Sequence, residues 1–101
     1  MASLRGMTWN SEGFKDPGKH LFVKEAIREH KLDFIALLET GKSNFSKPFL
    51  DSLAGTADFT WFCLPPCGRS GGILIGINVA SLIVKDVDNG DFMNKIFYIL
   101  F

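Results

Sequence analysis

Two polar residues in the first half of the chain each follow a short strand-like run, and both are of types that can serve phosphate or metal chemistry. Asn10 follows a strand-like run at residues 5–9, and Glu39 comes directly after the apolar run at residues 33–38. A carboxylate at the end of a buried strand needs a partner charge or a hard cation to offset its desolvation. An amide can donate to a phosphate oxygen or orient the carboxylate. The spacing alone leaves open that Glu39 is simply solvated and Asn10 is a turn residue.

The segment between the two runs predicts a helix that brings these residues together. Asp16 followed by Pro17 is a typical helix start, and the helix should run to about residue 31. Helical spacing predicts a buried face made of Phe22, Val23, Ala26 and Ile27. It predicts a water-facing side made of Lys19, Lys24, Arg28 and Glu29. A strand, helix and strand of this length form a right-handed crossover, so both strands should end at the sheet edge where ligands bind in open α/β sheets.

The rest of the chain continues the same α/β pattern as one domain. Ser46 begins a second, shorter helix that Gly55 ends, and strands are expected at residues 58–64, 73–77, 82–87 and 95–101. The order of strand, helix, strand, helix and then mostly strands is typical of a layered α/β fold.

Other motifs are weaker candidates for chemistry. The glycine-rich run at residues 68–72 contains Arg69 and could contact a phosphate, or could be a flexible entry into the next strand. Gly41-Lys42-Ser43 is not a P-loop, because Ala36 stands where the first glycine is required. His20 and His30 lie ten residues apart on the first helix, so neither is well placed as a general base for the strand ends.

Composition and charge exclude several classes of protein. The chain has 101 residues with 11 Lys+Arg and 11 Asp+Glu, so it lacks the basic excess of a stand-alone nucleic-acid binder. Cys63 and Cys67 are separated by three residues, which favours free thiols over a zinc or redox pair. The acidic group Asp86, Asp88 and Asp91 is interpreted as a solvated turn. Because no signal peptide or membrane-spanning run is present, we expect an intracellular protein without a membrane partner.

The chain is more apolar than a small domain usually is. Its hydrophobic residues other than Tyr, together with the ten Gly, number 56 of 101, whereas about 45–50% is usual for a globular domain. Residues 95–101 form an apolar run with no charge or turn to end it. We therefore expect the amino-terminal part of a larger domain, with a carboxy-terminal strand that could self-associate when uncovered.

Three segments, taken together, resemble the endonuclease/exonuclease/phosphatase superfamily, and are most similar to the apurinic-type endonuclease of plant non-LTR (LINE-type) retrotransposons. Residues 7–14 with Asp16-Pro17 and Lys19 resemble its Ser-Trp-Asn-x-Arg-Gly-Leu…Pro…Lys opening. Residues 31–40 resemble its Lys-Pro-Asp-…-Gln-Glu-Thr strand, and residues 68–73 its Gly-Arg-Ser-Gly-Gly-Ile segment.

The resemblance implies the amino-terminal part of a four-layer α/β sandwich, with residues 1–101 as a partial domain. It implies Mg²⁺ as cofactor and hydrolysis of DNA or another phosphodiester, in a location that could be nuclear. By the same resemblance, Asn10 would be the active-site amide and Glu39 the metal ligand, with Arg69 as a weaker phosphate contact.

The chain also departs from the family pattern. Glu12 replaces the usual Arg, and Leu38 the usual Gln. The later Gly-Asp-Phe-Asn and Ser-Asp-His motifs of the family have no counterpart here, and the second of them supplies the general base. The run at residues 90–94 is similar to the first motif, but it precedes a strand instead of following one and comes too early in the chain. We therefore expect little or no independent cleavage. The alternatives are a non-catalytic interaction module and a translated remnant without a function.

Overall fold

The first half of the chain forms a strand–helix–strand unit in the computed structural model, which describes residues 4–67 and 71–80. Strand β1 (Gly6–Asn10) is followed by helix α1 (Pro17–His30) and strand β2 (Phe34–Leu38). The two strands pair in parallel, as predicted, with Gly6 opposite Phe34 and Asn10 opposite Leu38. Their carboxyl ends therefore lie at the same edge of the sheet.

Capping residues set both ends of α1. The Asp16 carboxylate accepts a hydrogen bond from the Gly18 amide at 2.8 Å, and Pro17 occupies the first turn, where a missing N–H costs nothing. The helix ends at Lys31, whose backbone adopts the left-handed conformation with φ 49° and whose N–H bonds the Ile27 carbonyl. The predicted helix is confirmed to within one residue.

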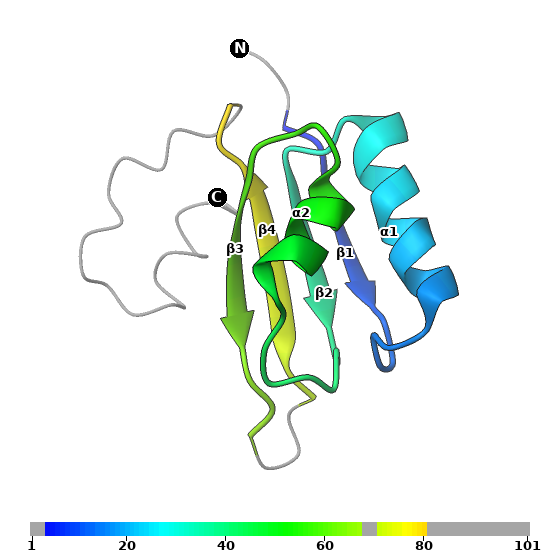
Figure 1. Cartoon of the computed structure of the whole chain (residues 1–101), viewed down its shortest axis with the longest axis vertical. Coiled ribbons are helices and arrows are strands. Elements are labelled where there is room, and N and C mark those ends of the chain that lie inside the picture. Colours follow the sequence, from blue (N-terminus) through cyan, green and yellow to red (C-terminus); the bar gives the residue numbers. More distant parts are fainter. Residues whose placement is uncertain (1–3, 68–70, 81–101) are drawn as a thin grey trace, which may run out of the picture.

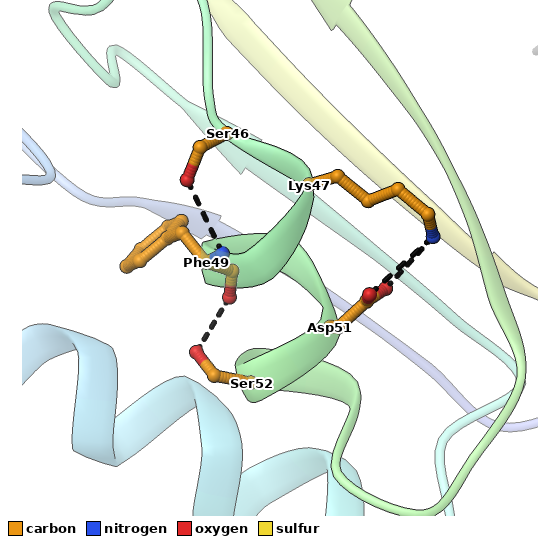
Figure 2. Close-up of polar contacts among 5 residues, drawn as sticks. All are labelled: Ser46, Lys47, Phe49, Asp51 and Ser52. Carbon is orange, nitrogen blue, oxygen red and sulfur yellow. Dashed lines mark hydrogen bonds and ion pairs between the residues drawn. The ribbon is translucent and has the colours of Figure 1, made fainter.

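The second helix, α2 (Lys47–Ala54), carries several local polar contacts (Figure 2). The Ser46 hydroxyl accepts from the Phe49 amide at 3.3 Å, and the Ser52 hydroxyl donates to the Phe49 carbonyl at 2.5 Å. Lys47 and Asp51, four residues apart, form an exposed ion pair at 3.3 Å, a geometry that adds a few tenths of a kcal/mol, about 0.3–0.5. The helix starts and ends where the sequence predicts.

Two further strands complete a mixed four-stranded sheet (Figure 1). Strand β3 (Phe59–Leu64) and strand β4 (Ile73–Asn78) pair antiparallel with each other, and β4 also pairs antiparallel with β2. The strand order is β1-β2-β4-β3. The structure thus confirms a layered α/β fold, whereas the expected strands at residues 82–87 and 95–101 lie outside the described residues.

Both helices pack on one face of this sheet. In Figure 1, α2 lies in front of the strands and α1 lies on the β1 side. The core between helices and sheet includes Val23 and Ile27 of α1, Leu53 of α2, and Ile35 and Leu37 of β2. Each of these side chains is at most 3% exposed. Burial of a side chain of this kind contributes about 1.5–3 kcal/mol, so this layer provides most of the stabilisation of the fold.

The opposite face of the sheet is apolar as well. Ala36 of β2 lies across from Ile75 of β4, and these residues form a second buried cluster with Ile77, against which Phe62 and Ile73 pack. Strand β2 therefore has apolar residues on both faces, which explains why its sequence is a continuous apolar run.

Two expectations for α1 are wrong. Phe22 is 49% exposed instead of buried. The centre of its ring lies 4.8 Å from the centre of the Trp9 ring, at the rim of the core. Lys19 is only partly exposed, because its ammonium group is bonded to the loop that precedes the helix. Helical periodicity describes only the helix and not the segments that pack against it. It could therefore not predict the exposure of Phe22 or of Lys19.

Candidate functional site

The candidate site lies where β1 and β2 end. Asn10 is the last residue of β1 and Glu39 immediately follows β2, and both residues are exposed. Since Asn10 is paired with Leu38, the two candidate residues lie on neighbouring strands at adjacent register positions. The structure therefore brings together the pair of residues that the sequence singled out. Arg69 lies outside the described residues.

The backbone at Glu39 has an unusual conformation. Its φ is 54°, in the left-handed region that residues other than glycine rarely adopt, at a cost of about 1–2 kcal/mol. The chain therefore turns sharply as it leaves β2, and surrounding hydrogen bonds must hold this turn.

The loop after β1 provides one set of these hydrogen bonds. The amide of Gly13 donates to the Glu39 carbonyl at 2.7 Å, and the amide of Phe14 donates to the Thr40 carbonyl at 2.9 Å. The Ser11 amide and hydroxyl both donate to the Leu38 carbonyl at 2.9 Å. The β1–α1 loop thus extends the strand pairing past the end of the sheet, and it positions the Glu39 backbone.

The segment leading into β4 holds the other side. Thr40 N–H donates to the Gly72 carbonyl at 3.2 Å, and Gly41 N–H donates to the Gly71 carbonyl at 2.6 Å. A Cβ atom at Gly71 would lie 2.9 Å from the Glu39 Cα, closer than non-bonded carbons approach. Gly71 is therefore required here because the chain passes directly against Glu39, which gives the glycine-rich run a structural role.

Asn10 has a defined local role. Its side-chain carbonyl accepts a hydrogen bond from the Glu12 amide at 3.1 Å, and Glu12 itself has φ 49°. This contact is the turn function that the sequence left open for Asn10. It also orients the side chain, because the carbonyl is used by the turn and the amide NH₂ remains as the donor.

Lys19 ties the same loop to α1. Its ammonium group donates to the carbonyl oxygens of Ser11, Glu12 and Gly13 at 2.5, 3.2 and 3.1 Å. Three loop carbonyls that would otherwise need water as partners therefore share one cation. The charge of Lys19 lies next to the strand ends, where it favours anionic groups at this edge.

A shallow hollow of about 410 Å³ opens beside this loop. Its lining residues are Glu12, Gly13, Lys15, Asp16, Lys19, Thr40 and Gly41. The lining includes two cations and two carboxylates, and Thr40 and Gly41 place it directly after Glu39 in the chain.

Two buried hydroxyl residues at the site are not among the candidates that the sequence predicts. Ser11 and Thr40 are 1% and 0% exposed, and each directly follows a candidate residue. Their position in the sequence could have indicated this role, because a hydroxyl residue directly follows each of the two candidate residues. A small buried hydroxyl can bond the backbone groups that are left unpaired where a strand ends.

The other sequence candidates are occupied with packing. The His20 ring contacts the Phe14 carbonyl through Nε2 at 2.9 Å and lies edge-on to Phe14 and Phe49. His30 is exposed at the far end of α1. The Lys42 ammonium lies 5.2 Å from the centre of the Phe45 ring, a cation–π contact. His20 and Lys42 therefore make packing contacts in the structure.

Three further features of residues 4–67 and 71–80 concern metal ions, thiols and the membrane. These residues contain no group of three or more His, Cys, Asp and Glu side chains that could hold a metal ion. Cys63 and Cys67 are free thiols, as predicted, and burial raises the pKa of the Cys63 thiol. None of the helices in this part of the chain has the length and apolar character needed to cross a bilayer.

Comparison of the chain with protein-family models, with curated proteins and with solved structures finds no match. The chemistry of the site is therefore inferred from its geometry and from the motifs in the sequence.

Proposed function

We propose that the chain forms the Asn10 and Glu39 part of a Mg²⁺-dependent phosphodiesterase site of the endonuclease/exonuclease/phosphatase type, of the kind that retrotransposon DNA endonucleases use. The observation that carries this proposal is the parallel pairing of β1 and β2, which puts both residues at one sheet edge. The hydrogen bonds on both sides of the left-handed Glu39 backbone add support, because a strained backbone that is held in place is common at functional sites.

The residues at this edge fit a partial magnesium site. Mg²⁺ binds oxygen ligands and often takes one or two carboxylates, with water and substrate phosphate completing its shell. The Glu39 carboxylate is exposed, and within residues 4–67 and 71–80 no ion pair occupies it. Glu39 would hold the ion, and the Asn10 amide would donate to a phosphate oxygen. When bound, Mg²⁺ supplies charge stabilisation at the phosphoryl group.

The remaining catalytic groups are not within these 101 residues. The Asp-Phe-Asn and Ser-Asp-His motifs of the family are absent from the sequence, and His20 is bonded to the Phe14 carbonyl. Removal of a general base typically costs a factor of about 10²–10⁴ in rate. We therefore expect the 101 residues by themselves to bind Mg²⁺ weakly and to cleave DNA poorly or not at all.

The second apolar face of the sheet supports the expected four-layer sandwich. Ala36, Ile75 and Ile77 form a continuous apolar row with Phe62 on the face opposite α1 and α2. A second sheet packing against this apolar face would complete the layers of the family fold.

Metal binding tests the proposal independently of catalysis. Mn²⁺ is added to the ¹⁵N-labelled chain as a paramagnetic substitute for Mg²⁺, and line broadening is followed by NMR. We expect broadening centred on residues 10–13 and 39–41, with loss of the effect in Glu39→Gln. Glu29→Gln is the matched control, because Glu29 is an exposed glutamate whose ion pair with Arg28, at 3.6 Å, contributes little.

Two results would contradict the proposal. One is equal broadening in wild type and Glu39→Gln, which would favour the non-catalytic interaction module. The other is efficient Mg²⁺-dependent nicking of supercoiled DNA by the chain alone that Glu39→Gln leaves intact. Robust nicking that Glu39→Gln abolishes would support the site and overturn only the expected inactivity.

A further inference from the structure

A second hollow lies at the other end of the sheet. It has a volume of about 430 Å³ and opens between the carboxyl ends of α1 and α2, close to Leu32 before β2 and Asn78 at the end of β4. Leu32 is seven residues before Glu39 along an extended strand, so this hollow is roughly 20 Å from the candidate phosphate site. The two hollows are therefore separate.

The floor of this hollow is aliphatic. Ile27, Leu32 and Ala54 line it and are at most 8% exposed, and Ala57 lines it while half-buried. A Cβ atom at Gly55, which also lines it, would meet no atom within 4 Å. No aromatic side chain is among the described lining residues, so the floor suits an alkyl group and provides no ring on which a nucleobase could stack.

The rim of the hollow is cationic. Lys24, Arg28 and Lys31 line it and are all exposed. Their spacing along α1 places them on one stripe of the helix. Arg28 pairs with Glu29 at 3.6 Å, whereas Lys24 and Lys31 take part in none of the ion pairs formed within residues 4–67 and 71–80. The positive charge of the rim is therefore largely uncompensated.

The helix dipole explains only part of this charge. Cations in the last turn stabilise the partial negative charge at the carboxyl end of a helix, an effect that decays within one turn. Arg28 and Lys31 are close enough to act in this way, but Lys24 lies six residues before His30, the last residue of α1. The dipole also gives no reason for an aliphatic hollow beneath the three cations.

We infer that this hollow binds a small amphipathic anion, with the alkyl chain on the aliphatic floor and a carboxylate against Lys24 and Lys31. A volume of about 430 Å³ is in the range of pockets that enclose small molecules, which runs from about 300 to 1,000 Å³. Such pockets combine a mostly apolar lining with a few charged groups, as found here. The ligand class is a medium-chain alkyl carboxylate.

Decanoate, below its micellar concentration, is the probe. We expect decanoate to shift the NMR methyl signals of Ile27, Leu32 and Ala54, with saturable binding. The double variant Lys24→Gln/Lys31→Gln should bind it about fivefold more weakly, the effect of removing two exposed charge contacts. Lys42→Gln/Lys47→Gln removes the same charge elsewhere and should leave the affinity unchanged. Decanol, which has no charge, should bind wild type and the first variant equally.

Three outcomes would overturn the inference. These are the absence of methyl shifts with decanoate, equal weakening in both double variants, and binding of inorganic phosphate at the same methyl groups as strongly as decanoate. Because neither variant changes Glu39 or Asn10, failure of this test leaves the metal test of the phosphodiesterase site unaffected.

Discussion

Substitution of Gly71 by alanine tests whether the segment before β4 is packed against Glu39. The new Cβ atom would lie 2.9 Å from the Glu39 Cα, 3.1 Å from its Cβ and 3.2 Å from its Cγ, whereas ordinary contacts are 3.4–4 Å. The closest of these atoms belongs to the backbone, so a side-chain rotation cannot relieve the clash. One of the two segments must move by about half an ångström.

The hydrogen bonds around Glu39 determine what such a movement costs. Gly41 N–H to the Gly71 carbonyl, at 2.6 Å, and Thr40 N–H to the Gly72 carbonyl, at 3.2 Å, join the two segments that would have to separate. Overpacking costs about 1–3 kcal/mol, and each weakened hydrogen bond up to about 1 kcal/mol. We expect a loss of about 2 kcal/mol in the free energy of unfolding, or roughly 10 °C in Tm for a domain of this size.

Urea denaturation followed by tryptophan fluorescence measures this loss. The control is Gly18→Ala, since the nearest atom to a Cβ at Gly18 is the Asp16 carboxylate oxygen at 3.3 Å, and alanine is the better helix former. We expect Gly18→Ala to be neutral or stabilising by up to about 1 kcal/mol. A Gly71→Ala protein within about 0.5 kcal/mol of wild type would refute the close packing of residue 71 on Glu39, because surface substitutions have effects of that size.

Three further predictions concern Lys19 and the cysteines. Lys19→Met leaves three loop carbonyl groups without their cation. We expect the free energy of unfolding to fall by about 2 kcal/mol and amide hydrogen exchange at residues 11–14 to become faster. Unchanged exchange at these residues would contradict the bonding role of Lys19. Burial raises the pKa of the Cys63 thiol above its ordinary value of 9.0. Iodoacetamide at pH 8 should therefore modify the exposed Cys67 before Cys63. Equal rates of modification would be evidence against burial of Cys63. Because the folded state favours the neutral Cys63 thiol, this contribution to stability is complete below pH 9.0 and declines as the pH rises through the raised pKa, a decline that Cys63→Ala should remove.

Local patterns predicted the elements of the described part well. Asp16-Pro17 and Ser46 each begin a helix, and Gly55 ends the second, because a cap depends on residues within one turn of itself. The run at residues 33–38 is a strand with apolar residues on both faces, because alternate side chains of a central strand meet two different layers. The parallel pairing of the first two strands follows from the handedness of the crossover.

Contacts between distant segments could not be predicted in this way. Helical periodicity assigned Lys19 to water, but the loop at residues 11–13 folds back so that its carbonyl groups surround the ammonium. The same limit applies to Phe22, which is exposed because Trp9 meets it only at the rim of the core. The glycine-rich run at residues 68–72 was predicted to contact an anion or to be a flexible entry into the next strand. The close approach of Gly71 to Glu39 depends on how β4 enters the sheet.

The amino-acid sequence by itself determined the secondary structure, the α/β class and the choice of Asn10 and Glu39 as candidate residues, since each depends on short-range patterns of apolar and capping residues. Only the tertiary structure decided how Glu39 is held in a left-handed turn between Gly13 and Gly72, and that the cations of α1 border an aliphatic hollow. Both arrangements join segments that are far apart in the sequence. The relative position of such segments depends on how the whole chain packs, and not on the spacing of residues within any one segment.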